Sequence, residues 1–289
     1  MPGQRIFGNS INDATYMGLS SNILWHQTNF NSLRKILSSK TILCSYSLED
    51  TRFVLGGKTA FAMVSMCDLP FSELTSYLSK YGGYSLGFSR SWGISHKFNP
   101  VWYCDPQSMA ADFIKHSLER MRRTGSGDGE ALLFSNVLSY VKMVEDELPK
   151  HNYKRYRFYD EREVRFIPSF HYMINGDEKP LMYEEEYMDY KKSHNGNSLL
   201  DFGVEFDWTD LKYIIVKEEK QIQPLRAYLT KQGCPNDLVQ IFFHKQVEED
   251  FIGENHNEEV EKFSMTKDDV KKLVEMTVAE MNKIQDALG

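Results

Sequence analysis

Long apolar runs are absent from this sequence. No stretch of its 289 residues approaches the roughly 20 apolar residues that a helix needs to cross a bilayer. The N-terminal stretch MPGQRIFGNSINDATYMGLS is too polar for a secretory signal peptide. These absences predict a soluble protein of the cytoplasm that does not act at a membrane.

Cysteine is scarce, and several well-known catalytic signatures are missing. The four cysteines, Cys44, Cys67, Cys104 and Cys234, form no CxxC pair, so their spacing fits no zinc site. We therefore expect buried, reduced thiols and no metal centre. The chain also lacks a P-loop, a Rossmann glycine fingerprint, a nucleophile elbow and an HExxH helix, so none of those chemistries is indicated.

Charge of one sign is concentrated in one segment. The formal net charge is −7, and the segment from Glu248 to Glu261 holds seven acidic residues without a lysine or arginine. Without those seven, the chain has 34 acidic and 34 basic residues, so the rest of the protein is neutral. Net charge therefore neither favours nor excludes binding to nucleic acid.

The sequence does contain enough apolar surface for a large core, with 41% hydrophobic and 13% aromatic residues. Strand-like segments alternate with helical patterns, which predicts an α+β fold. The predicted strands are 21–27, 41–45, 60–67, 84–89, 101–104, 155–168, 211–216 and 239–243, and the predicted core helices are 30–39, 68–80 and 221–231. Residues 52–58 are predicted to form a loop, and residues 169–210 to be irregular.

Three further segments complete the predicted organisation around a core domain of residues 1–245. Residues 106–149 have the pattern of an inserted helical hairpin, Pro106–Arg123 and Glu130–Leu148, joined by the flexible stretch GSGDG. Residues 246–265 form an acidic connector. Residues 266–289 have the apolar spacing of a long amphipathic C-terminal helix.

The first candidate for chemistry is His26-x-Thr28, at the end of a predicted strand and just before a helix. A strand end followed by a helix N-terminus is a suitable place to hold a ligand. A neutral histidine and a threonine hydroxyl can both hydrogen bond the hydroxyls of a ribose. A histidine beside Trp25 is also commonly structural, so both interpretations stay open.

The second candidate is the pair Glu161 and Glu163 in the stretch Glu161–Ile167. Residues two apart on a strand point to the same face, and neighbouring carboxylates repel, which raises the pKa of one of them. Such a pair suits acid–base work or the stabilisation of a cationic transition state. The alternative is an exposed edge strand whose charges alternate with core residues.

Two weaker features accompany these. Within 84–93, Tyr84, Phe88 and Trp92 could wall a slot for a ring, with Gly87 allowing close approach, or could be ordinary core aromatics. The basic, aromatic run Lys150–Arg157 could contact phosphates and stack on bases, or could be a solvated strand.

Several motifs resemble the AbiGi family of abortive phage-resistance proteins. The opening W-H-x-T-x-x-x-x-L-x-x-I-L of that family is met by Trp25 through Leu37, its V-S-x-C-D-[IL]-P by Val64–Pro70, its Y-G … G-F … W-G … N-P-V-x-Y series by Tyr81–Tyr103, and its E-R-E-[WV]-R-[FY]-x-P by Glu161–Pro168, with Val164 in place of the commoner tryptophan. The resemblance covers about residues 20–245. The family is described as the antitoxin of an abortive-infection pair.

The order of these motifs also resembles a wider group that includes the DarT-like DNA ADP-ribosyltransferases. This resemblance implies an ADP-ribosyltransferase-like split β-sheet core that uses NAD as a substrate and modifies a nucleic acid or a protein. It implies that Glu163 stabilises the oxocarbenium ion formed as nicotinamide leaves, and that Glu161 orients the acceptor. For the NAD site it implies His26 on the ribose with Thr28 assisting, Arg52 on the phosphates and Tyr84 stacked on nicotinamide.

Two other functions remain open on the same fold. One is a non-enzymatic antitoxin or interaction protein, whose acidic connector and C-terminal helix dock onto a basic surface or a partner helix. That helix could instead pack on its own domain. The other is a sensor that binds a nucleotide without consuming it.

Overall fold

The computed structural model describes residues 21–78, 81–125, 127–148, 153–168, 179–194 and 198–252. The chain divides into two compact units, Met1–Phe251 and Ile252–Gly289, and the site lies in the first. The start of the predicted acidic connector, residues 246–252, belongs to helix α9 (His244–Ile252). The rest of the connector and the predicted helix over 266–289 lie outside the described residues.

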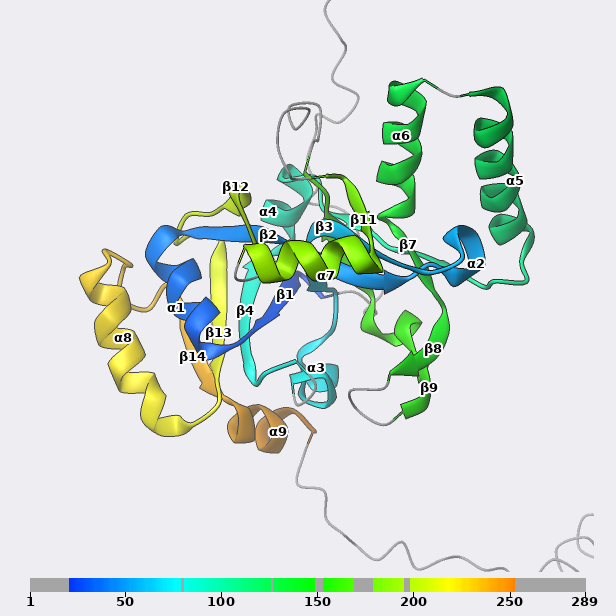
Figure 1. Cartoon of the computed structure of the whole chain (residues 1–289). Coiled ribbons are helices and arrows are strands. Elements are labelled where there is room, and N and C mark those ends of the chain that lie inside the picture. The colour runs from blue at the N-terminus through cyan, green and yellow to red at the C-terminus, as the bar shows by residue number, and fades with distance from the viewer. Residues whose placement is uncertain are drawn as a thin grey trace, which may run out of the picture. The chain divides into compact units, whose positions relative to one another are not determined.

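Helices and strands alternate along the first unit, which confirms a mixed α+β protein (Figure 1). In chain order the elements are β1 (Ile23–Thr28), α1 (Phe30–Ser39), β2 (Thr41–Asp50), α2 (Arg52–Leu55), β3 (Lys58–Cys67), α3 (Phe71–Leu78), β4 (Tyr84–Ser89), α4 (Arg90–Ser95), β5 (Asn99–Pro100), β6 (Trp102–Cys104), α5 (Met109–Thr124), α6 (Asp128–Leu138), β7 (Val141–Met143), β8 (Glu145–Leu148), β9 (Tyr153–Arg157), the 3₁₀ helix η3 (Phe158–Glu161), β10 (Glu163–Phe166), β11 (Leu181–Tyr183), α7 (Glu184–Ser193), β12 (Ser198–Glu205), β13 (Leu211–Val216), the 3₁₀ helix η5 (Glu219–Gln221), α8 (Ile222–Lys231), β14 (Gln240–Phe243) and α9. Each of the predicted strands has a counterpart in this order.

Within the described residues, a 10-stranded sheet forms the centre of the unit, and its main path runs β12-β2-β3-β1-β4-β13-β14. Strands β10 and β11 also pair with β3, and β5 pairs with β10. The neighbours in this sheet are antiparallel except β13 and β14, which are parallel and connected through α8. This parallel pair confirms the strand–helix–strand order predicted for the end of the core.

The sheet splits in the second half of β3, between Met63 and Cys67. Strand β2 pairs with the first part of β3 up to Ser45↔Met63, whereas β1 meets β3 at Trp25↔Cys67 and otherwise pairs with β4. Between those two register pairs, residues 64–66 of β3 pair with β10 alone among the described strands. The divergence of β1 and β2 from β3 leaves space for side chains between the three strands.

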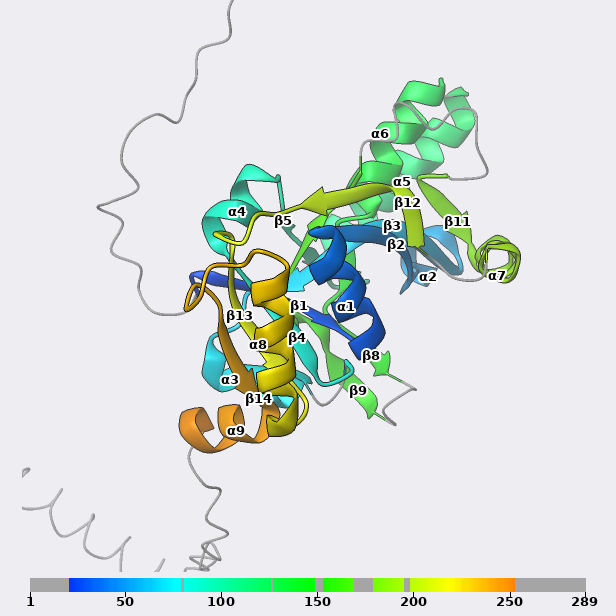
Figure 2. The ribbon, with the colours of Figure 1, turned by 90° about the vertical axis from the view of Figure 1, so that its left-hand side faces the viewer.

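Side-chain alternation on β13 brings helices to both faces of the sheet. Ile214 and Val216 belong to an apolar cluster that includes residues of α1 and α8, and these two helices lie next to each other in Figure 2. Ile215 belongs to a second cluster, with residues of α3 and α9. The fold thus buries the central strands on both sides.

The inserted hairpin is shorter than predicted. Helices α5 and α6 are present, but α6 ends at Leu138, and residues 141–148 form β7 and β8 in place of further helix. Strand β7 pairs with β6, and β8 pairs with β9. Pairing with distant strands overrides a local helical spacing of apolar residues, because strand preference depends on tertiary context.

Two other local predictions were wrong. The predicted loop at 52–58 begins with the single helical turn α2, which contacts α5. The stretch 169–210, predicted to be irregular, contains β11, α7 and β12 among its described residues, and α7 lies against β3 and β11. Helix α7 was not predicted because most of its residues are polar. Only Tyr187 and Tyr190 of this helix are buried.

Candidate functional site

A cavity of about 280 Å³ lies at the split in the sheet. Strands β1, β2 and β3 line it, together with side chains from later parts of the chain. The lining residues with polar side-chain atoms are Trp25, His26, Gln27, Ser45, Ser47, Glu49, Ser65, Tyr77, Tyr81, Lys142, Glu161 and Glu163. Polar groups that are far apart in the sequence therefore open onto one space.

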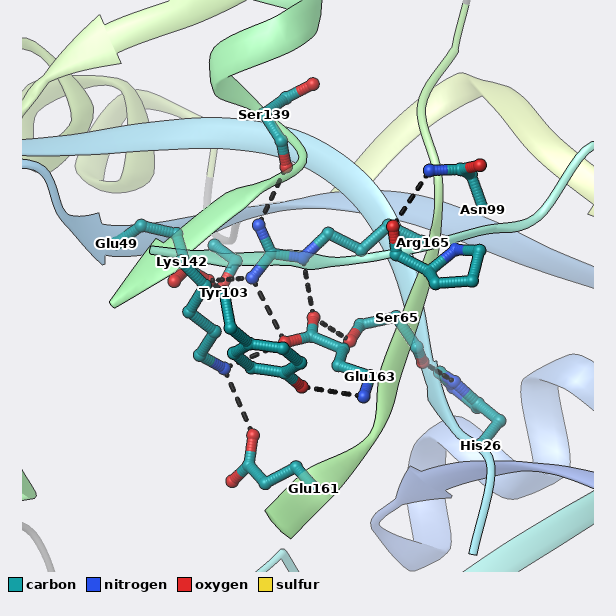
Figure 3. A network of polar contacts seen from close by, with 12 residues as sticks. His26, Glu49, Ser65, Asn99, Tyr103, Ser139, Lys142, Glu161, Glu163 and Arg165 are labelled. Carbon is teal, nitrogen blue, oxygen red and sulfur yellow. Dashed lines mark hydrogen bonds and ion pairs between the residues drawn. The ribbon is translucent and has the colours of Figure 1, made fainter. Parts of the chain in front are cut away.

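Ser65 connects His26 to Glu163 at this cavity (Figure 3). The Nδ1 atom of His26 lies 3.1 Å from the carbonyl oxygen of Ser65, and the Ser65 hydroxyl donates to Oε1 of Glu163. A carbonyl oxygen can only accept, so this contact requires the proton of a neutral ring on Nδ1 and leaves Nε2 as the acceptor. Burial lowers the pKa of His26, which favours that neutral ring near pH 7.

Glu163 is ionised and held by two cations. The Nε atom of Arg165 lies 2.7 Å from Oε1, and Nζ of Lys142 lies 2.8 Å from Oε2. Burial by itself would raise the pKa of Glu163, but Arg165 and Lys142 outweigh burial and hold that pKa well below its usual value. The raised pKa expected from a carboxylate pair is therefore wrong for Glu163.

Glu161 reaches the same lysine from a different element. Nζ of Lys142 lies 3.1 Å from Oε2 of Glu161, while Tyr81 and Tyr156 donate to Oε1 at 2.6 and 3.0 Å. Glu161 ends η3 rather than sharing a strand with its partner, and Arg162 has φ 46° before β10 begins. The two carboxylates meet because the backbone turns at Arg162, not because of strand alternation.

Arg165 is fully buried and completes the arrangement. Its guanidinium also lies 2.9 Å from Glu49 and donates to the carbonyl oxygen of Ser139 at 2.7 Å. We call the five charged residues the carboxylate network: Glu49, Lys142, Glu161, Glu163 and Arg165 (Figure 3). Three carboxylates share two cations there, so the formal charge of the network is −1.

Three predicted site residues do not line this cavity: Thr28, Arg52 and Tyr84. Arg52 pairs with two aspartates and its side chain is 62% exposed. The Tyr84 hydroxyl accepts from the amide of Gln221 at 2.9 Å and is therefore engaged elsewhere. The structure brings His26 together with both glutamates, but it does not bring the residues predicted for phosphate and ring binding to them.

The aromatic residues of 84–93 belong to the core. Phe88 and Trp92 are buried, and their rings stack with centroids 4.6 Å apart. A Cβ atom on Gly87 would lie 2.7 Å from the ring of Trp25. Gly87 therefore allows a neighbouring tryptophan to approach the strand, and the hypothesis of a ligand slot between these aromatics is wrong.

The basic run is partly neutralised where it is described. Arg155 pairs with Glu145, and Arg157 pairs with Asp160, all at exposed positions. Residues 149–152 lie outside the described residues. Paired surface charges of this kind give no specific indication of a phosphate site.

Sequence reasoning missed Ser65, Lys142 and Arg165. Arg165 could have been found, because it follows Glu163 by two positions on a strand and so shares its face. Lys142 carries no local signal, since its segment has helical apolar spacing yet forms β7. Ser65 reaches the site because the neighbouring strands leave β3 at that point.

The described residues show no sign of a metal site or a reactive thiol. Across the described ranges, no group of three or more His, Cys, Asp or Glu side chains could hold a metal ion. The four cysteines are free and buried, as predicted, and burial raises the pKa of Cys44 to about 12. No helix in the described part of the chain is long and apolar enough to cross a membrane.

Comparison with known proteins assigns this chain to a family. The sequence profile of the family described as "Putative abortive phage resistance protein AbiGi, antitoxin" matches residues 36–217. The chain belongs to the AbiGi family. The matched stretch of this anti-phage, abortive-infection family contains the whole carboxylate network and Ser65.

A curated relative agrees with this family. It is "Abortive phage resistance protein AbiGi" of Lactococcus lactis subsp. cremoris, 24% identical over 199 residues. The alignment covers 59% of this chain and 77% of the AbiGi relative.

Proposed function

We propose that this AbiGi protein is the antitoxin of an abortive-infection pair and restrains a toxin partner. The observation that carries the proposal is the family match over residues 36–217, because the description of that family names an antitoxin. The inserted hairpin offers a surface to such a partner. Met109, Phe113 and Leu133 on α5 and α6 are 84%, 68% and 63% exposed, and apolar side chains exposed in this way commonly mark protein interfaces.

Co-expression with the product of the adjacent gene tests this proposal. We expect the chain to restore growth when that product is toxic, and Phe113→Asp to abolish the rescue. Ile94→Asp is the matched control, because Ile94 on α4 is an equally exposed apolar residue, 62% accessible, away from the hairpin. Full expression of the wild-type chain without rescue of growth would contradict the antitoxin role.

A second candidate is NAD-dependent ADP-ribosyltransferase activity, favoured by the meeting of His26 and Glu163 through Ser65 at one cavity. The resemblance to DarT-like enzymes requires such a meeting. In this role His26 hydrogen bonds a ribose hydroxyl of NAD, and Glu163 stabilises the cation that forms as nicotinamide leaves. Glu161 then orients the acceptor.

The contacts of Glu163 explain why we rank this activity second. A carboxylate stabilises a developing cation most strongly when its own charge is not already compensated. Here Lys142 and Arg165 contact its two oxygens. The net negative charge of the carboxylate network still favours a cationic transition state, but less than an unpaired glutamate would.

Release of nicotinamide from NAD, with and without nucleic acid, separates the two candidates. If the chain is an enzyme, Glu163→Gln should slow release by about 10²–10³-fold. Glu145→Gln is the control, since Glu145 is a more exposed glutamate paired only with a surface arginine in the described structure. Growth rescue that survives Glu163→Gln, without any nicotinamide release, assigns the antitoxin role alone.

A further inference from the structure

We infer that the side-chain amide of Gln27 forms two hydrogen bonds with a flat ligand ring. The ligand offers a donor and an acceptor next to each other, as a primary carboxamide or the edge of a nucleobase does. This inference rests on the cavity being a ligand site, as in the second candidate function. Gln27 follows His26 on β1 and lines the same cavity.

The side-chain amide of Gln27 has no hydrogen-bond partner among the residues that the structure describes. Both of its polar atoms, Oε1 and Nε2, are buried without a hydrogen bond to any described residue. Asn136 and His244 each leave one such atom unpaired, but neither lines this cavity. Since burying an unpaired polar group costs stability, an entire unpaired amide in a residue that lines the cavity points to a group that is completed by a ligand.

Two tyrosines provide a surface for a flat ring. Tyr77 and Tyr81 line the cavity together with Gln27, and their ring centroids lie 4.7 Å apart at an interplanar angle of 43°. Aromatic side chains attract other flat rings in offset or edge-on arrangements. The cavity, of about 280 Å³, suits a ring with a sugar rather than a whole dinucleotide.

The negative charge at the cavity limits which ring ligands can bind. Glu161 and Glu163 line the cavity, and the carboxylate network has a net negative charge. A ring that carries a carboxylate is therefore disfavoured, whereas a neutral or cationic ring with an amide is accepted. Gln27 can match an amide or a base edge equally well, because it has both donors and acceptors.

Calorimetric titration of the full chain with four probes and NAD tests this inference. It also shows whether Gln27 binds a carboxamide or a nucleobase. Nicotinamide is compared with nicotinate, and adenosine with purine riboside, which lacks the exocyclic amine. We expect nicotinamide or adenosine to bind at least about tenfold more tightly than its partner probe. Gln27→Leu should remove this preference and weaken binding by about 10- to 30-fold, the effect of losing two neutral hydrogen bonds.

Gln232→Leu is the matched control, because Gln232 is exposed and does not line the cavity. It should bind all probes as the wild type does. Thermal unfolding gives an independent readout. Gln27→Leu removes two unpaired buried atoms, so its unfolding midpoint should stay the same or rise. A clear fall in the midpoint would assign Gln27 to structure and overturn the inference.

The remaining outcomes separate this inference from the transferase proposal. Wild-type binding to NAD or a probe that Gln27→Leu leaves unchanged overturns the inference and spares the transferase proposal. Gln27-dependent binding without nicotinamide release from NAD supports the inference and contradicts the transferase reaction. Absence of binding to NAD and to all four probes overturns both.

Discussion

The guanidinium of Arg165 lies 2.7 Å from the carboxylate of Glu163, two residues earlier on β10, and both side chains are buried. Residues with this spacing share one face of a strand, so the pair follows from local sequence. Lys142 on β7 and Glu49 on β2 extend it through tertiary contacts. The carboxylate network therefore ties three strands together at the cavity.

Arg165→Met should destabilise the protein strongly. The substitution leaves Glu163 without its closest cation and Glu49 without its buried partner, and breaking a buried ion pair costs about 3–5 kcal/mol. Urea unfolding measures the loss. Arg155→Met is the control, because its salt bridge to Glu145 is exposed and should contribute almost nothing. Equal effects of the two substitutions would contradict the importance of the buried network.

The free energy of unfolding should fall in acid as Glu163 becomes protonated. Its folded pKa is lowered from 4.5, so the unfolded chain binds this proton at a higher pH than the folded chain does. The stability that Glu163 contributes is fully present above its unfolded pKa and is lost as the pH falls through the folded value.

Unfolding measured between about pH 5 and pH 3 tests this dependence. Glu163→Gln should show a shallower loss of stability than the wild type, because the titrating group is gone. Glu145→Gln should keep a slope close to that of the wild type, since solvent screens its contact with Arg155. A Glu163→Gln slope identical to the wild-type slope would show that Glu163 does not titrate in this range.

Tyr81→Phe should weaken the support of Glu161. The Tyr81 hydroxyl donates to Oε1 of Glu161 at 2.6 Å, and a hydrogen bond to a charged group contributes about 1.5–3 kcal/mol. The ring remains in place, so thermal unfolding should report mainly the lost hydroxyl. Tyr159→Phe, at a tyrosine that is 59% exposed, should leave the midpoint nearly unchanged. The reverse order would contradict this account of Glu161.

Gly87→Ala should disturb the wall of the cavity. The new Cβ atom would lie 2.7 Å from the Trp25 ring, which lines the cavity, and overpacking of this kind costs about 1–3 kcal/mol. Gly57→Ala is the control, because no neighbouring atom of the described residues lies within 4 Å of its Cβ position. Near-UV circular dichroism of the tryptophans and urea unfolding should change for Gly87→Ala alone.

Much of the central sheet could be predicted from period-2 alternation. On β1, Trp25 faces one apolar cluster and Leu24 the other, as the pattern indicates. The pattern was misleading where pairing partners are distant. Val141–Met143 has helical spacing but pairs with β6, and no window around it contains that partner.

The candidate site also could be predicted only in part. His26, Glu161 and Glu163 could be proposed from residue type and motif order, and Arg165 follows from its spacing. Nothing local connects Lys142 or Tyr81 to them, and although Gln27 directly follows His26, only the tertiary structure shows that its amide is unpaired among the described residues.

The sequence by itself determined the alternation of helices and strands, the buried thiols and the motifs of the AbiGi family, because these depend on residues close together in the chain. The tertiary structure decided which polar groups share a cavity and which charges compensate one another. Arg52 and Tyr84 have suitable side chains for a nucleotide, yet neither lines the cavity. Which side chains line the cavity depends on strand register and on the path of the backbone through the whole domain. Long-range packing sets both.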